Sequence, residues 1–296
     1  MRDKILFFLF LGMFLTGAIL FGVNHYNRKQ DEEGLNRQQQ ELIRLKEEAL
    51  EEKDSGEEDP AGKSIEEILK EASKGLHREE MQEEKRLYTG SGMLREYEKL
   101  YELNQDMIGW LTIENTVIDY PVMQTIGEEE YYLHRDFYGE DNQNGCLILD
   151  TDCVVGTGRE ERGYQIGKEP STNLIIHGHT MKTGAMFGTL ERYKEQSYGE
   201  EHSKIAFDTL YEKREYEVLA VFYSQVYKGN EQVFKYYNFF QADTREAFDD
   251  WYGNIKKMSL YDTGVSAEFG DEFITLSCCA YPDKDRRFVV VGKRVK

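Results

Sequence analysis

The sequence predicts a mainly β domain in the C-terminal part of the chain, folded as an antiparallel sandwich or a closed barrel. Of 38 Phe, Trp and Tyr residues, 31 lie in residues 91–296, so the hydrophobic core belongs to that region. From Ile108 onward, short runs of β-branched and aromatic residues alternate with turn residues. Several short strands with few helices between them are typical of sandwiches and barrels.

Seven strands and one helix are predicted in this domain. The strands cover residues 116–123, 146–149, 173–177, 204–209, 215–224, 272–279 and 287–293. The helix is expected over 243–256, where Asp243 and Glu246 form a capping pattern. After that pattern, one helical face carries Phe248, Trp251, Tyr252 and Ile255, which predicts an amphipathic helix.

The N-terminal segment predicts a membrane anchor over residues 1–26. Residues 5–23 carry no charge, and only glycines and Thr16 interrupt their apolar side chains. At a rise of about 1.5 Å per residue, such a helix nearly spans a hydrocarbon layer of about 30 Å. A cleaved signal peptide is the alternative, but it would have a shorter apolar stretch followed by a small-x-small site. Basic residues flank the segment on both sides, so charge alone does not decide its orientation.

Residues 27–90 predict a charged, helical stalk between the anchor and the domain. They are rich in Glu, Lys and Gln and contain one aromatic residue, Tyr88. A break at 54–62 precedes a second helix that begins at Ser64. A further helix is expected near Tyr97, at the start of the 91–296 region, because apolar residues recur there at helical spacing.

The composition excludes some classes of function. The chain has 37 Lys and Arg against 56 Asp and Glu, a formal charge of −19. Such a chain repels phosphate backbones, so no nucleic-acid partner is expected. Its four cysteines are too few for a disulfide scaffold, and none forms a C-x₂-C pair. Cys146 and, less clearly, Cys153 fit buried packing positions, and His134 fits a packing role beside two tyrosines.

Reactive side chains stand at the ends of three predicted strands. One strand ends in His-Gly-His (177–179), another ends in Cys-Cys (278–279), and the last opens with Arg-Arg (286–287). In a small barrel such ends gather at one rim, so a Cys, a His and an Arg could converge. A thiol with an ordinary pKa of about 8.5 needs a neighbouring base or cation to become a thiolate. Arg cannot act as that base and would stabilise an oxyanion instead.

Strand alternation distinguishes the two neighbouring thiols. Cys279 shares a strand face with Thr275 and Ser277, whereas Cys278 shares the other face with Ile and Leu side chains. We expect the Ile/Leu face to point into the core, which makes Cys278 a buried thiol with a raised pKa. Cys279 should then point toward the rim with Thr275 and Ser277. Arg287 can meet Cys279 if the last two strands pair in the matching register.

These stretches resemble the sortase family, and within it class B. The similar stretches are 104–113 (NQDMIGWLTI), 116–124 (TVIDYPVMQ), 130–137 (EYYLHRDF), 175–187 (IIHGHTMKTGAMF), 275–279 (TLSCC) and 287–291 (RFVVV). The resemblance covers about residues 93–296. It implies a closed eight-stranded β-barrel with N-terminal helices and one helix between the last barrel strands. It also implies that 91–296 is an extracellular cysteine transpeptidase domain.

The resemblance assigns a role to four residues. Cys279 would be the nucleophile that attacks the Thr carbonyl of a C-terminal sorting signal and forms a thioester. His179 would be the general acid and base, and Arg287 would stabilise the oxyanion together with the backbone N–H of Ala280. No metal or organic cofactor is expected, because side chains and backbone amides supply every step.

The implied partners are surface proteins with a C-terminal sorting signal, and an amine acceptor on a peptidoglycan precursor or a pilin. The implied location is the cell membrane, with a single N-terminal span, a cytoplasmic N-terminus and an extracellular domain.

Two residues depart from the family pattern. Cys278 stands where Thr is usual, and His177 stands where an aromatic residue is usual. A zinc site built from both histidines and both cysteines is therefore an alternative, although adjacent strand residues point to opposite faces. The segment 154–172 also resembles an added loop.

Two other functions compete with a sortase. One is a cysteine L,D-transpeptidase acting on peptidoglycan, but such enzymes place Arg closer to the Cys than Arg287 lies to Cys279. The other is a catalytically inactive surface-binding module.

Overall fold

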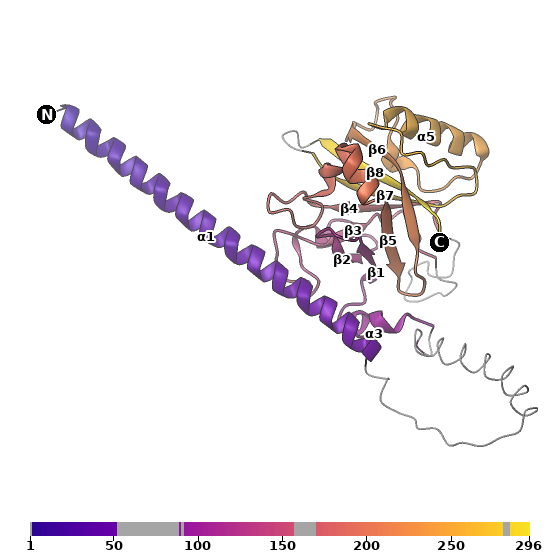
Figure 1. The fold of residues 1–296 in the computed structure, drawn as a ribbon. Helices are drawn as coiled ribbons and strands as arrows, with labels where there is room; N and C mark the ends of the chain where they lie inside the picture. Colours follow the sequence, from indigo (N-terminus) through magenta and orange to yellow (C-terminus); the bar gives the residue numbers. More distant parts are fainter. Residues whose placement is uncertain (1, 52–88, 90–91, 157–169, 281–284) are drawn as a thin grey trace, which may run out of the picture. The chain divides into compact units, whose positions relative to one another are not determined.

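The computed structural model of the chain describes residues 2–51, 89, 92–156, 170–280 and 285–296. The chain divides into two compact units, Met1–Arg44 and Leu45–Lys296. The first unit belongs to the long helix α1 (Arg2–Glu51), and the second contains the β domain (Figure 1).

Helix α1 runs unbroken from Arg2 to Glu51 and thus crosses the boundary at residue 26 that separates the predicted anchor from the predicted stalk. The Glu-, Lys- and Gln-rich residues 27–51 are helical as expected, because these residue types have high helix propensity. In the part of the chain that the structure describes, no helix is long and apolar enough to cross a membrane. The anchor at 1–26 stays a prediction. The predicted break at 54–62 and the helix from Ser64 lie outside the described residues.

The domain is a closed barrel, as the resemblance implied, and not a sandwich. Its strands follow the order β1-β2-β3-β4-β7-β8-β6-β5, and β1 pairs with both β2 and β5, which closes the ring. Most pairs are antiparallel, but β2 with β3 and β4 with β7 are parallel. The strands are β1 (Met107–Thr112), β2 (Asp119–Met123), β3 (Leu147–Leu149), β4 (Asn173–Gly178), β5 (Lys204–Thr209), β6 (Glu215–Gln225), β7 (Phe273–Cys279) and β8 (Arg286–Arg294).

Strand β1 is missing from the seven strands that the sequence predicts. Its first five residues are all buried, so the alternation of apolar and polar residues that marks a half-exposed strand is absent. Gly109 lies in the middle of this strand, where a side chain would collide with Asp208 and Phe207 of β5. Glycine thus permits the close approach of β5, but in the sequence it resembles a strand breaker.

One short helix precedes β1, and others connect the strands. They are α3 (Arg95–Leu103), η1 (Tyr131–His134), η2 (Leu190–Lys194), α4 (Gln196–Glu201), η3 (Tyr236–Asn238) and α5 (Arg245–Met258). The helix expected near Tyr97 is α3, and it buries Tyr97 and Leu100. The helix expected over 243–256 is α5, which lies between β6 and β7. Its N-cap is Thr244 rather than the predicted Asp243, since the Thr244 hydroxyl accepts a hydrogen bond from the Ala247 N–H at 3.2 Å.

Helix α5 covers one face of β7 and β8. Its Phe248, Trp251 and Ile255 are buried in one cluster with Phe273 of β7 and with β8 valines. The Trp251 ring lies 4.8 Å from the ring of Phe273 between centroids. Aromatic packing of this kind makes a second hydrophobic layer outside the barrel. The residues of β7 that share a face with Phe273 therefore lie beneath this layer.

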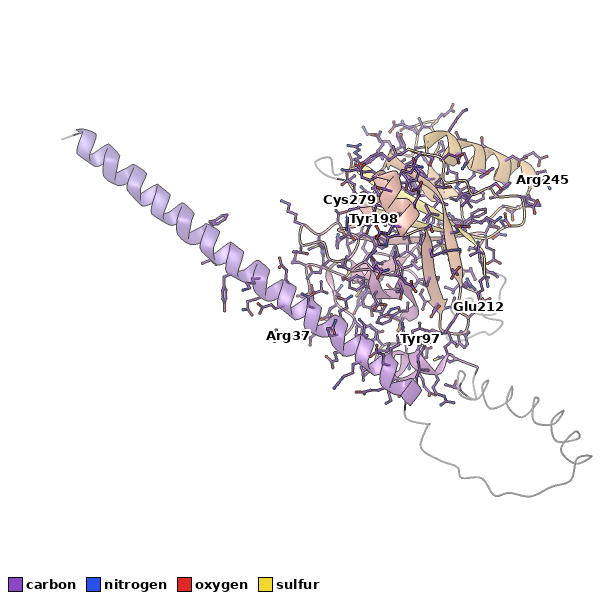
Figure 2. All side chains as sticks on the ribbon, viewed as in Figure 1. Arg37, Tyr97, Tyr198, Glu212, Arg245 and Cys279 are labelled. Carbon is purple, nitrogen blue, oxygen red and sulfur yellow. The ribbon has the colours of Figure 1, made fainter. Side chains whose placement is uncertain are left out.

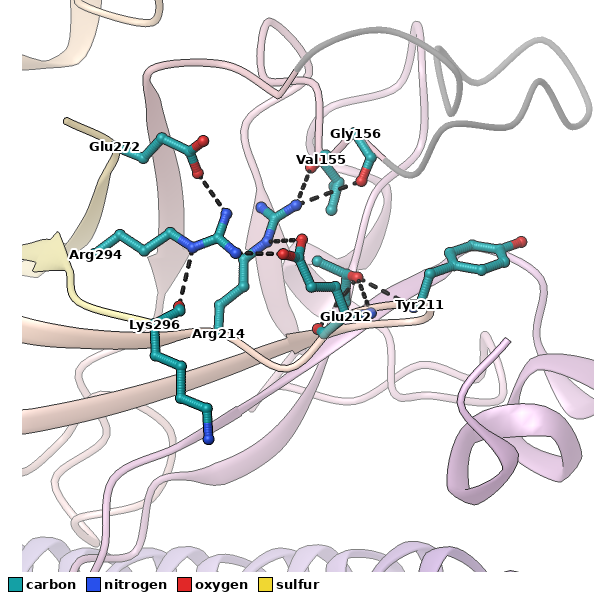
Figure 3. A network of polar contacts seen from close by, with 9 residues as sticks. Val155, Gly156, Tyr211, Glu212, Arg214, Glu272, Arg294 and Lys296 are labelled. Atoms are coloured by element: carbon teal, nitrogen blue, oxygen red, sulfur yellow. Dashed lines mark hydrogen bonds and ion pairs between the residues drawn. The ribbon is translucent and has the colours of Figure 1, made fainter. Parts of the chain in front are cut away.

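A network of charged side chains lies at the start of β6 and the end of β8 (Figure 3). Arg294 contacts both Glu212 and Glu272, the latter at 2.7 Å. Arg214, whose side chain is 1% exposed, donates to Glu212 at 2.9 Å and to the carbonyl of Val155 at 2.7 Å. The Glu212 carboxylate offsets part of the cost of burying this guanidinium, and the bond to Val155 joins that segment to the barrel.

Candidate active site

Three adjacent strands carry the predicted Cys, His and Arg. β7 lies between β4 and β8 in the barrel. In the antiparallel pair of β7 and β8, Cys279 lies directly opposite Arg287, which is the register that the sequence analysis required. In the parallel pair of β4 and β7, Gly178 lies beside Cys278, so the next position in this register sets His179 beside Cys279. The fold thus brings all three predicted residues to neighbouring positions.

The two neighbouring thiols have different surroundings, as predicted. Cys278 is 2% exposed, and burial above all raises its pKa to about 12. Cys279 is half-buried at the C-terminal end of β7 (Figure 2). A thiol with so high a pKa stays protonated at neutral pH, which fits the packing role predicted for Cys278, and Cys279 stays the predicted nucleophile.

The prediction that Thr275 and Ser277 point toward the rim is wrong. Both side chains are 1% exposed. The Thr275 hydroxyl donates to Asn173 Oδ1 at 2.8 Å, and the Ser277 hydroxyl lies 2.7 Å from the Tyr236 hydroxyl. The layer formed by α5 and the segment before it covers this face of β7, which the alternation of the strand does not reveal.

The His179 ring is held by the η1 segment. Its Nε2 lies 2.7 Å from the carbonyl oxygen of Leu133. A carbonyl only accepts, so Nε2 carries the proton and Nδ1 is the nitrogen left to exchange one. The ring of His134 stacks on that of His179, with 5.5 Å between centroids and 16° between planes. His134 is an exposed residue, so its packing is limited to this contact with His179 and the role predicted for it stays a prediction.

The pKa of His179 is lower than that of an ordinary histidine. Burial is the main cause, because desolvation penalises the charged imidazolium. The neighbouring His134 lowers the pKa further, while the hydrogen bond to Leu133 opposes both effects. His179 is therefore mostly neutral at pH 7 and can accept a proton at Nδ1.

Two backbone groups beside Cys279 are already engaged. The hydroxyl of Thr180 donates to the carbonyl of Cys279, a contact that joins the end of β4 to the end of β7. The N–H of Ala280 donates to the carbonyl of Arg286 at 2.9 Å. The role of Ala280 as an oxyanion donor stays a prediction, and it requires that hydrogen bond to open. Thr180 was missed in the sequence, because its contact depends on the parallel pairing of two strands far apart in the chain.

Arg287 has a second neighbour that the sequence analysis missed. Arg287 is half-buried on β8, where the strand register sets it between Cys279 of β7 and this second neighbour, Ser224 of β6. Ser224 is 7% exposed, and its hydroxyl has no hydrogen-bond partner among the described residues. Buried hydroxyls without a partner are uncommon. No local signal in the sequence marks Ser224.

The structure does not support the alternative zinc site built from both histidines (177 and 179) and both cysteines (278 and 279). The His177 ring turns to Asp150, with Nε2 3.2 Å from Oδ2. In the described residues, one group of three possible metal ligands is found, and it contains neither His179 nor a cysteine. Cys146 and Cys153 are buried free thiols whose pKa is raised mainly by burial, as expected of packing residues.

Comparison with known proteins identifies the family. Residues 111–295 match the family model of the sortase domain. The chain belongs to the sortase family. It is 32% identical over 208 residues to sortase B of Listeria monocytogenes serovar 1/2a, an alignment that covers 68% of this chain and 74% of that protein. It is 30% identical over 203 residues to sortase B of Staphylococcus aureus, covering 68% and 75%.

Solved structures agree with this assignment. The crystal structure of S. aureus sortase B matches this sortase with a TM-score of 0.58 and 26% identity, over 78% of this chain and 99% of that one. A Bacillus anthracis protein similar to sortase B matches with a TM-score of 0.56 and 29% identity, over 71% and 87%. The resemblance to class B drawn from the sequence is confirmed, and this sortase is a cysteine transpeptidase.

Substitution of each neighbouring thiol should separate nucleophile from packing residue. We expect Cys279→Ala to abolish thioester formation and transpeptidation, because the thiol that would carry the acyl group is lost. Cys278→Ala should keep most activity and lower the free energy of unfolding by roughly 1 kcal/mol, since a small buried group is removed. Peptide cleavage and urea unfolding of both variants measure the two effects. Activity that survives in Cys279→Ala but not in Cys278→Ala would show that the nucleophile lies one residue earlier.

The protonation of His179 should follow its burial. We expect its NMR titration midpoint to lie below the value of about 6.5 of an unperturbed histidine. Because the unfolded chain then binds more protons than the folded one, His179 should lower the free energy of unfolding as pH falls through the unfolded-state pKa. The same titration in urea gives the reference. A midpoint at or above the reference would contradict the lowered pKa.

Proposed function

We propose that this sortase cleaves a C-terminal sorting signal after Thr, through a thioester on Cys279, and transfers the protein to a cell-wall amine. The observation that carries the proposal is the position of Cys279 on β7, flanked by the end of β4 with His179 and by Arg287 on β8. This arrangement offers a nucleophile, a proton carrier and a fixed cation around one carbonyl group.

The first half of the proposed reaction forms the thioester. Nδ1 of the neutral His179 takes the proton of the Cys279 thiol, the sulfur attacks the Thr carbonyl carbon, and the negative charge moves to the carbonyl oxygen, where the Arg287 guanidinium stabilises it. The carbon–nitrogen bond then breaks, and Nδ1 of the protonated His179 gives its proton to the leaving amine. The hydrogen bond from Nε2 to Leu133 keeps Nδ1 free for this transfer.

The second half transfers the acyl group. An acceptor amine attacks the thioester carbonyl carbon, Nδ1 of His179 takes a proton from the attacking nitrogen, and the sulfur leaves as thiolate. The product is a new amide bond, so neither an oxidant nor a metal ion enters the balance. The S. aureus relative has been solved in complex with a substrate. For this chain, we propose surface proteins with a sorting signal as donors, and a peptidoglycan precursor or pilin amine as acceptor.

We also propose that residues 1–26 anchor the enzyme in the cell membrane, with the N-terminus in the cytoplasm and the catalytic domain outside. The uncharged stretch 5–23 supports an anchor, and the proposed substrates are exported polypeptides and cell-wall amines.

A library of sorting-signal peptides tests the reaction. We expect a subset to be cleaved after Thr, in EDTA as well as without it, and mass spectrometry to find the acyl fragment on the peptide that contains Cys279. Cys279→Ala should give neither product. Processing of a bare peptidoglycan stem but of no sorting signal would indicate an L,D-transpeptidase. Absence of thioester with every peptide and stem would indicate an inactive binding module.

Protease treatment of intact protoplasts tests the topology. If the domain lies outside, added protease should release or digest the 91–296 region, because no membrane protects it. A cytoplasmic protein measured in the same sample serves as the control for intact cells. If the 91–296 region were protected together with the cytoplasmic control, the proposed topology would be contradicted.

A further inference from the structure

We propose that Glu129, Asp150 and His177 form a site for one divalent transition-metal ion, with Zn²⁺ as the best-matched probe. One ligand atom from each residue lies within 4.8 Å of the others. The group contains none of the residues assigned to the reaction. The proposal is therefore independent of the transpeptidase mechanism.

The Asp150 and His177 side chains lie about as close together as two ligands of one ion would. Nε2 of His177 lies 3.2 Å from Oδ2 of Asp150. Two ligands of a tetrahedral zinc ion with bonds of about 2.0–2.1 Å lie roughly 3.4 Å apart. Asp150 is held in place, because its other oxygen accepts from the Asp152 N–H at 3.0 Å and its own N–H donates to the Ile175 carbonyl at 2.9 Å.

Glu129 supplies the third ligand from a different part of the chain. It is an exposed residue just before η1, so its carboxylate can move the short distance needed to close on the other two. Water would complete the coordination on the exposed side. One imidazole with two carboxylates is a ligand set that suits zinc and neighbouring divalent metals.

The group combines two carboxylates with one imidazole. The pKa of Glu129 is raised by burial and by repulsion from Asp150, while His177 lowers it. A dication would be attracted by both carboxylates and could bind the imidazole nitrogen as a third ligand.

The site connects two segments that hold the His179 ring. Glu129 precedes η1, whose Leu133 carbonyl and His134 ring contact His179. His177 lies on β4, two residues before His179. An ion bound to both segments would restrain η1 against β4 and so restrain the His179 ring. It would act through position and would not touch the reacting atoms.

Calorimetric titration with Zn²⁺ tests the site. The full chain carrying Cys279→Ala is used, so that the reactive thiol cannot hold the metal, and it is first stripped with EDTA. We expect one saturable site, with affinity at least about tenfold weaker in Glu129→Gln and in His177→Gln, since even loss of a second-shell partner costs about 10–100-fold. Glu128→Gln, a change at the exposed neighbour of Glu129, should leave the affinity unchanged.

Hydrogen exchange supplies the second readout. The Leu133 N–H bonds to the Glu130 carbonyl at 3.0 Å within η1. Zn²⁺ should slow its exchange in the parent and in Glu128→Gln, but not in Glu129→Gln. Circular dichroism without metal checks that the variants fold, and should His177→Gln unfold, the comparison of Glu129→Gln with Glu128→Gln decides. No saturable binding, or equal binding and protection in those two variants, would overturn the proposal.

Discussion

The parallel pairing of β4 with β7 is the constraint on which the active site depends. Parallel strands end at the same edge of a sheet, so this pairing brings His179, just past the end of β4, beside Cys279 at the end of β7. The antiparallel pairing of β7 with β8 then adds Arg287 from the other side. A shift of one residue in β7 would exchange the faces of Cys278 and Cys279 and turn the half-buried thiol into the core.

Buried polar contacts fix that register. Asn173, at the start of β4, is fully buried; its Oδ1 accepts from Thr275 of β7, and its amide nitrogen donates to the Phe239 carbonyl at 2.9 Å. At the other end of the pair, Thr180 donates to the carbonyl of Cys279. A shifted register would leave the Asn173 amide without partners, at a cost of about 1–3 kcal/mol for each unsatisfied group. Polar groups thus specify an alignment that apolar packing alone would specify less sharply.

Helix α5 and its neighbouring segment complete the support of the site. They cover the face of β7 that carries Phe273, Thr275 and Ser277, and leave Cys279 half-buried at the end of the same face. The His179 ring depends on a different segment, since Leu133 and His134 of η1 contact it. Cys279 and the His179 ring are therefore supported by two regions of the chain that lie far apart in the sequence.

The sequence by itself determined the β-rich class, the α5 helix and the difference between Cys278 and Cys279. These follow from local patterns, because the periods of strands and helices are visible in neighbouring residues. The resemblance added the closed barrel and the family. Strand β1 was not predicted, since a buried strand with a central glycine shows no alternation of apolar and polar residues. The burial of Thr275, the engaged N–H of Ala280 and the meeting of Glu129 with Asp150 and His177 were decided by the tertiary structure alone, because each depends on contacts between segments that only the folded barrel brings together.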